Sequence, residues 1–122
     1  MDYLLPELEK RKICFVEINR PPDGASVEGK PSGEEQIPDI LKDLKHKIPS
    51  VLLIGNGKFS PEEADKYIKA KVIDMVSMGT NYLSNPDLAN RIKNNYPLNP
   101  PDWSTAYSGG EKGYTDIPIY TP

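Results

Sequence analysis

The fold class of this chain is decided by the stretch VLLIGNGKFSPEE at residues 51–63. Its first four residues are apolar and are followed by Gly-Asn-Gly, which predicts a short buried strand that ends in a turn. Ser60, Pro61 and Glu63 then form a capping box with proline at the first helical position, so we expect a helix to begin at Pro61. A strand, a turn and a helix in this order are the repeating unit of parallel α/β proteins.

The same alternation continues on both sides of this unit. Residues 13–18 and 73–78 are apolar runs that predict two further buried strands. Helices are expected over residues 4–12, over 37–48 with Pro38 at the first helical position, and after Asn85 as the N-cap of the segment NPDL at 85–88. The order α-β-α-β-α-β-α predicts an α/β fold with parallel strands and right-handed crossovers, and three such strands leave two sheet edges unpaired.

Two segments rich in proline and glycine stand apart from this alternation. Residues 21–33 hold almost no apolar side chain and predict a long exposed loop. Residues 96–122 contain prolines that exclude a continuous helix or a central strand, but they also contain Trp103 and four tyrosines. Because disordered segments are poor in aromatic residues, we expect an ordered, irregular tail.

Composition excludes several classes of protein. The chain has 122 residues and a net charge of −3, from 15 basic and 18 acidic residues, which argues against nucleic acid as a partner. Its longest apolar runs have four residues, so no membrane-spanning segment is expected, and the acidic opening does not resemble a signal peptide. The single Cys14 and the single His46 provide no metal-binding spacing, and one cysteine agrees with a cytoplasmic location.

Candidate binding residues follow the second and third expected strands. Gly55 and Asn56 come after the second, and Gly79 and Thr80 come after the third. Glycine lets a ligand approach the backbone closely, and N–H groups at such turns bind anions, so the two turns together predict a phosphate cradle. The alternative is that both glycines only permit tight turns. Cys14 is expected to be a buried, unreactive thiol, His46 a surface residue, and Glu17 either a group that faces a site or a carboxylate that only binds water.

Three segments carry a family resemblance: NPDL at 85–88, PLNPPD at 97–102 and STAYSGGEKGYTD at 104–116. They closely resemble the C-terminal end of the Old Yellow Enzyme family of FMN-dependent NAD(P)H oxidoreductases, or ene-reductases. The resemblance implies the last three strands of a TIM-type (β/α)8 barrel, in a single partial domain over 1–122: helix and strand at 1–20, the loop at 21–33, βα units at 34–95 and the tail at 96–122.

The resemblance also implies roles for particular residues. Gly55, Asn56, Gly79 and Thr80 would hold the FMN phosphate, and Tyr107 would lie near the flavin at the substrate pocket. The chain departs from the family at Thr80, where an arginine usually pairs with the phosphate. The family's substrate-anchoring His/Asn pair and its proton-donating tyrosine come from earlier strands, so no catalytic residue is assigned to this chain.

Two functions follow from the resemblance. One is the C-terminal part of an FMN-dependent oxidoreductase that passes a hydride from NAD(P)H to flavin and then to an activated alkene; the part alone is expected to be inactive. The other is a truncated, non-catalytic relative, either a phosphate-binding remnant or an interaction module. In both cases the unpaired sheet edges predict self-association.

Overall fold

The computed structural model describes residues 1–20, 40–107 and 110–122. These residues form two compact units, Met1–Ser77 and Met78–Pro122, and each unit is described by itself. The expected loop at 21–33 and the expected helix start at Pro38 lie outside the described residues.

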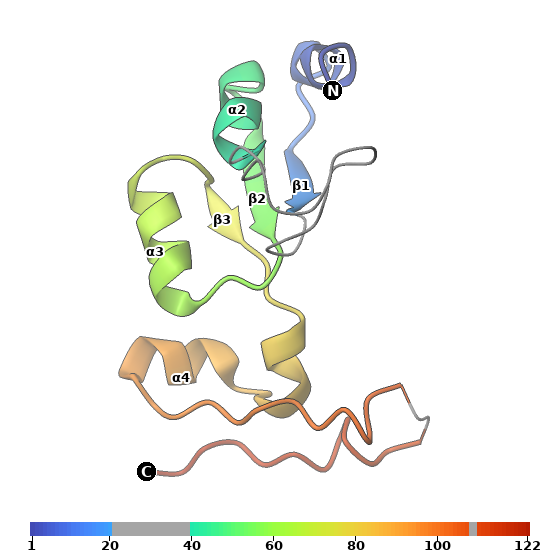
Figure 1. Cartoon of the computed structure of the whole chain (residues 1–122), viewed down its shortest axis with the longest axis vertical. Helices are drawn as coiled ribbons and strands as arrows, with labels where there is room; N and C mark the ends of the chain where they lie inside the picture. The colour runs from blue at the N-terminus through green and yellow to red at the C-terminus, as the bar shows by residue number, and fades with distance from the viewer. Residues whose placement is uncertain (21–39, 108–109) are drawn as a thin grey trace, which may run out of the picture. The chain divides into compact units, whose positions relative to one another are not determined.

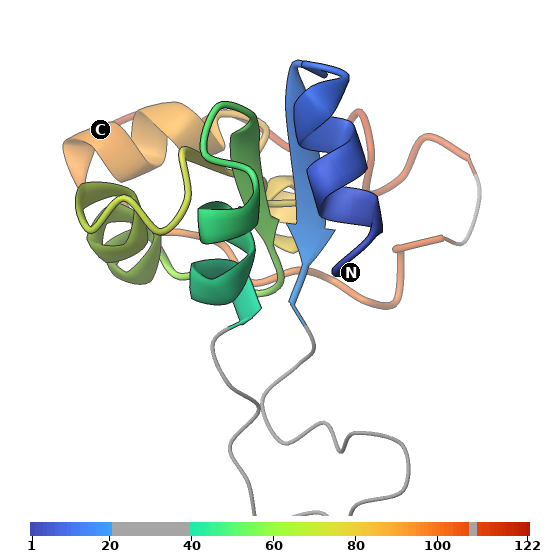
Figure 2. The same cartoon turned by 90° about the horizontal axis from the view of Figure 1, so that it is seen from above.

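The first unit is a parallel sheet with helices, as its sequence predicts. Its elements are α1 (Leu4–Lys10), β1 (Phe15–Asn19), α2 (Ile40–Lys47), β2 (Leu52–Asn56), α3 (Pro61–Lys69) and β3 (Met75–Val76) (Figure 1). The strands are parallel and lie in the order β1-β2-β3. Along this sheet α2 lies between α1 and α3, and α1 contacts α2 (Figure 1 and Figure 2). The α/β class is confirmed.

Ser60 caps α3 as predicted. The Ser60 hydroxyl oxygen accepts a hydrogen bond from the Glu63 backbone N–H at 3.1 Å, and Pro61 occupies the first turn. The two carboxylate oxygens of Glu63 accept hydrogen bonds from the two terminal nitrogens of Arg20, at 2.6 and 2.7 Å. The start of α3 is therefore tied to the chain that follows β1.

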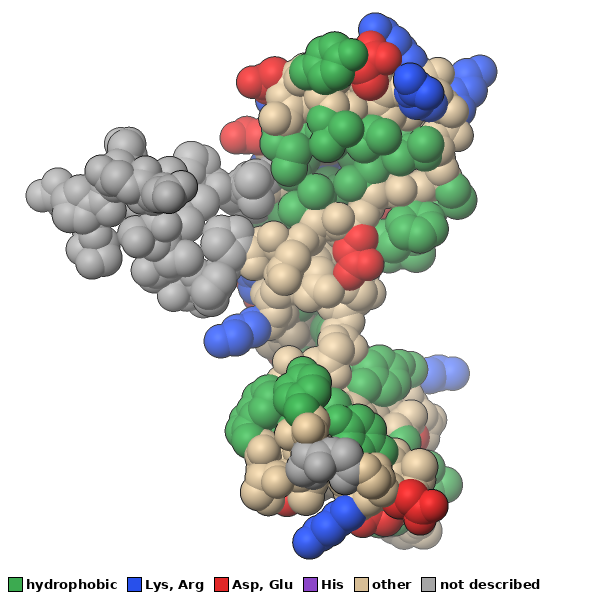
Figure 3. Space-filling model, turned by 90° about the vertical axis from the view of Figure 1, so that its right-hand side faces the viewer, with side chains coloured by type: hydrophobic (Ala, Val, Ile, Leu, Met, Phe, Trp, Pro, Cys, Tyr) green, Lys and Arg blue, Asp and Glu red, His purple; other side chains and the backbone are tan. Residues whose placement is uncertain are grey.

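The prediction that the strands are buried is wrong for one face of the sheet. Val51 and Leu53 are fully buried with Leu41, Leu44, Ile48 and Ile73. The opposite face, which we call the open face, consists of Phe15, Glu17, Leu52, Ile54 and Met75, which share a face through the strand register. Phe15 is 52% exposed and Met75 is 41% exposed, because the described helices do not cover this side. Figure 3 shows hydrophobic side chains gathered over one side of this unit.

The third strand is shorter than the expected run at 73–78. At its N-terminal end, the Asp74 carboxylate accepts the Leu53 N–H at 2.7 Å and so takes a place in the ladder that a backbone carbonyl would fill. Backbone bonds from the Asp74 N–H to the Leu53 carbonyl and from the Ser77 N–H to the Gly55 carbonyl continue the pairing on both sides of Met75–Val76. The segment therefore runs alongside β2 although only two residues are regular strand.

The second unit contains a short 3-10 helix, η1 (Thr80–Ser84), and α4 (Leu88–Asn94). The prediction that Asn85 caps α4 is wrong, since Asp87 occupies the N-cap position. Asn85 is fully buried, and its amide bonds the Asn81 carbonyl and both the carbonyl and the N–H of Asn99. Its side chain is used to join two loop segments, so the helix begins later. Beyond Asn95 the described residues form turns and irregular chain.

Candidate functional site

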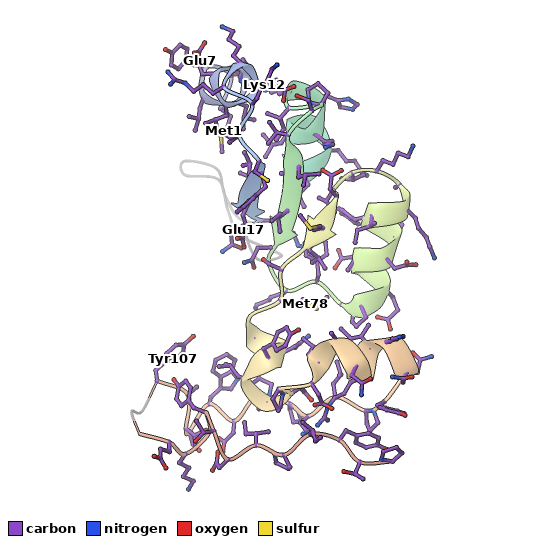
Figure 4. All side chains as sticks on the ribbon, turned by 180° about the vertical axis from the view of Figure 1, so that it is seen from behind. Met1, Glu7, Lys12, Glu17, Met78 and Tyr107 are labelled. Carbon is purple, nitrogen blue, oxygen red and sulfur yellow. The ribbon has the colours of Figure 1, made fainter. Side chains whose placement is uncertain are left out.

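Glu17, Asn56 and Ser77 meet where the three strands of the first unit end. Glu17 Oε1 accepts hydrogen bonds from Asn56 Nδ2 at 2.8 Å and from the Ser77 hydroxyl at 2.6 Å. We call these residues the carboxyl-end cluster, and Figure 4 shows Glu17 at the end of β1. Ligands of parallel α/β proteins bind at this edge of the sheet. The cluster lies where the sequence places a site, and Ser77 joins it through the register of β3.

The two donors of this cluster act on the charge of Glu17. The hydrogen bond from Ser77, and then the one from Asn56, lower the pKa of the Glu17 carboxyl below its ordinary value. Glu17 is therefore an ionised acceptor at neutral pH. Glu17 was expected either to face a site or only to bind water. In the structure it also binds and orients the side-chain amide of Asn56.

Gly55 is explained by packing in the interior of the first unit. It lies inside β2, paired with Ile18 and Val76, so the strand extends past the position where the sequence predicts a turn. A Cβ atom at Gly55 would lie 3.0 Å from Ile73 Cδ1 and 3.1 Å from Phe59 Cε2. The space that the missing side chain leaves is already filled by these two residues.

Gly57, which is not among the predicted site residues, is the glycine that the backbone of this turn requires. Its φ of +116° is left-handed, and a Cβ would lie 2.6 Å from Arg20 Cγ and 2.8 Å from the Arg20 carbonyl oxygen. Arg20 Nε in turn donates to the Gly57 carbonyl at 2.7 Å. The Gly-Asn-Gly pattern was a signal for this turn, whereas nothing in the sequence pairs it with Arg20.

Gly79 and Thr80 lie at the start of η1 in the second unit. Gly79 has an ordinary φ of −88°, so its conformation does not require glycine. A Cβ at Gly79 would meet no atom within 4 Å, and both residues are exposed. Neither the backbone conformation nor the packing therefore requires glycine at this position.

Tyr107, the remaining predicted site residue, lies in the tail of the second unit. It has a left-handed φ of 63°, and its backbone N–H donates to the Tyr114 hydroxyl oxygen at 2.8 Å. Its side chain is 82% exposed. The structure thus places Gly79, Thr80 and Tyr107 in one unit and Gly55 and Asn56 in the other.

Two other candidate residues have different outcomes. His46 lies exposed on α2, as expected. The prediction that Cys14 is buried is wrong: its thiol is exposed, because Cys14 precedes β1 and so lies outside the covered part of the sheet.

Within residues 1–20, 40–107 and 110–122, no three His, Cys, Asp or Glu side chains gather as a metal site. No helix in the same ranges is long and apolar enough to span a bilayer.

The structure thus defines a parallel α/β protein with polar residues at the carboxyl ends of its strands. No protein-family model matches the chain. It is 34% identical over 117 residues to a probable flavin mononucleotide-dependent alkene reductase of Leishmania infantum, covering 96% of this chain and 29% of that protein. It is 39% identical over 118 residues to a 12-oxophytodienoate reductase-like protein of Solanum lycopersicum, covering 96% and 30%.

Solved structures agree with these sequence matches. Morphinone reductase in complex with tetrahydroNAD has a TM-score of 0.79 at 29% identity, over 98% of this chain and 30% of the other. The old yellow enzyme of Trypanosoma cruzi has a TM-score of 0.79 at 29% identity, over 98% and 29%. Over nearly its whole length the chain is similar to members of the old yellow enzyme family, and it spans about 30% of the length of the relatives it matches.

Proposed function

We propose that this chain is the C-terminal part, with the last three strand–helix units, of an FMN-dependent NAD(P)H oxidoreductase of the ene-reductase type. The agreement of sequence and fold with alkene and morphinone reductases over nearly the whole chain carries this proposal. The family chemistry is the transfer of a hydride from NAD(P)H through flavin to an activated alkene. In this proposal the chain contributes residues that bind FMN, and it contributes no catalytic residue.

The residues proposed to hold FMN are those named from the resemblance. Gly55, Asn56, Gly79 and Thr80 would contact its phosphate, and Tyr107 would lie near its ring. Gly79 fits this role, since it exposes backbone next to open space and has no conformational need for glycine. Thr80 offers a hydroxyl where a guanidinium would make a bidentate, charge-assisted contact, so this chain's own contribution to affinity is small.

Flavin content tests this function directly. The purified chain is expected to show little flavin absorbance, because the strands that would contact the ring are not among its residues. Co-expression with the Leishmania infantum reductase lacking its matched segment is expected to give a complex with stoichiometric FMN and NADPH-dependent alkene reduction. The matched control is the same deletion protein expressed without this chain. Stoichiometric flavin in the purified chain alone would contradict the proposal that other strands are needed to bind the flavin ring. A complex without flavin would contradict the proposed function.

The alternative is a non-catalytic relative that acts as a phosphate-binding remnant or as an interaction module. The open face supports the interaction module, since its exposed Phe15, Leu52 and Met75 are available to another polypeptide. A complex that forms in the co-expression experiment and holds no flavin would favour this alternative. The expected cytoplasmic location stays a prediction from the single cysteine.

A further inference from the structure

Arg20 makes contacts with both the turn after β2 and the first turn of α3. Its backbone N–H donates to the Asn56 carbonyl at 2.9 Å, and its Nε donates to the Gly57 carbonyl at 2.7 Å. Its two terminal nitrogens bind the two carboxylate oxygens of Glu63 at 2.6 and 2.7 Å. One side chain therefore joins the end of β1, the turn and the helix.

The surroundings of Arg20 leave its guanidinium little freedom. The group lies 4.0 Å above the centre of the Phe59 ring, and its side chain is only 18% exposed. Gly57 adopts its left-handed φ directly against Arg20, where a Cβ would collide. A planar fork that binds two carboxylate oxygens and stacks on a ring has one favourable orientation, so the conformation of the turn follows from that of Arg20.

We propose that Arg20 is a positioning residue that fixes the Asn56–Gly57 turn and thereby holds Asn56 in place for the flavin phosphate. The phosphate part of this inference rests on the proposed function. The turn is held from both sides, because Arg20 binds its backbone and Glu17 binds the Asn56 side chain. Arg20 bonds the backbone carbonyls of Asn56 and Gly57, so in this proposal it affects binding through the geometry of the turn.

Lys45 provides a matched control in the same unit. Its ammonium donates to the Asp74 carboxylate at 2.6 Å and to the Val51 carbonyl at 3.1 Å, so it also joins a carboxylate and a backbone carbonyl. The side-chain exposures of this pair, 20% and 32%, match those of Arg20 and Glu63, 18% and 34%. Lys45 contacts neither Asn56 nor Gly57 in any of these bonds. Its removal therefore reports the general cost of losing such an ion pair.

The test compares Arg20→Ala, Arg20→Lys and Lys45→Ala in the full chain by amide hydrogen exchange and by FMN titration followed by NMR. Both alanine variants are expected to lower the melting temperature similarly. Only the Arg20 variants are expected to speed exchange at Asn56, Gly57 and Lys58, by about tenfold or more, and to weaken FMN binding by a similar factor. Arg20→Lys keeps the charge and loses the fork, so it is expected to rescue stability in part but not exchange in the turn.

Each outcome decides a different part of the inference. Exchange in the turn that is equal in Arg20→Ala and Lys45→Ala would overturn the positioning role. Faster exchange in the turn with unchanged FMN affinity would overturn its connection to the ligand. A wild-type chain in which saturating FMN shifts no amide of either unit would overturn the proposed phosphate contacts themselves, while the exchange data still decide whether Arg20 fixes the turn.

Discussion

Asp87 and Arg91 form an ion pair at the start of α4, with Arg91 Nε 2.8 Å from Asp87 Oδ1. Both residues also hold the tail. Asp87 Oδ2 accepts the Tyr120 N–H at 3.0 Å, and Arg91 donates to the Pro97 carbonyl at 3.0 Å with its guanidinium 5.5 Å from the centre of the Tyr120 ring. The irregular tail is thus fastened to a helix by one pair of charges.

Replacement of Arg91 is expected to unfasten the tail. Arg91 is only 3% exposed, so Arg91→Ala leaves polar groups without their partner in a covered position. The free energy of unfolding of the second unit should fall by about 3 kcal/mol, as for the loss of one member of a buried pair. Urea unfolding followed by Trp103 fluorescence measures this. Lys93→Ala, on the exposed side of the same helix, is the control and should change stability by less than about 0.5 kcal/mol.

The same pair predicts a loss of stability in acid. Burial opposes ionisation of Asp87, but the hydrogen bonds from Arg91 and the Tyr120 N–H outweigh it, and the pKa lies below its ordinary value of 3.8. A carboxyl whose pKa is lower in the folded state stabilises the fold above 3.8, and this contribution disappears as the pH falls through the lowered pKa. Unfolding measured at a series of pH values should show this loss. Asp87→Asn should be less stable at neutral pH, and its free energy of unfolding should fall less steeply as the pH is lowered. An equally steep fall in this variant would show that Asp87 is not the source of the acid sensitivity.

Replacement by alanine is expected to lower stability at Gly57 and to have little effect at Gly79. Gly57→Ala places a Cβ 2.6 Å from Arg20 Cγ at a φ of +116°, and it should destabilise the first unit by about 1–3 kcal/mol. Gly79→Ala has open space and an ordinary φ, so stability should change by less than about 0.5 kcal/mol or rise slightly. Denaturant midpoints of the two variants measure the difference. Equal effects would show that the Gly57 turn relaxes.

The sequence predicts the fold of this molecule better than the contacts at its candidate site. Apolar runs and the Ser60 capping box predict the parallel sheet and α3 because these are local patterns with a direct physical cause. The ends of β3 and α4 are mispredicted because Asp74 and Asn85 use their side chains for contacts with residues distant in sequence. The pairing of Arg20 with Gly57 and Glu63 is missed for the same reason, since it joins residues separated by 37 and 43 positions.

Thr80 offers a gain-of-function test of the proposed phosphate site. Thr80 is exposed beside Gly79, so an arginine there has room. Thr80→Arg should tighten FMN binding by roughly tenfold to a hundredfold through a bidentate contact with the phosphate. Titration calorimetry with FMN and with riboflavin, which lacks the phosphate, separates this contact from ring binding. Gly79→Val, which fills the open space, should weaken binding. Equal FMN affinities in wild type and both variants would mean that Gly79 and Thr80 do not contact the ligand.

The open face and the strand edges predict that the isolated chain associates with itself. Leu52, in the central strand, is 40% exposed next to Phe15, which is 52% exposed. Among the described residues the outer edges of β1 and β3 pair with no other strand and offer further backbone donors and acceptors. Light scattering at concentrations of about 1–100 µM should therefore show dimers or larger species. Leu52→Lys should shift the chain toward monomer, because association would bury the new charge. Ile68→Lys on α3 is the control, since Ile68 is 39% exposed but lies outside the open face. A wild-type chain that stays monomeric throughout this range would show that the open face is tolerated in water.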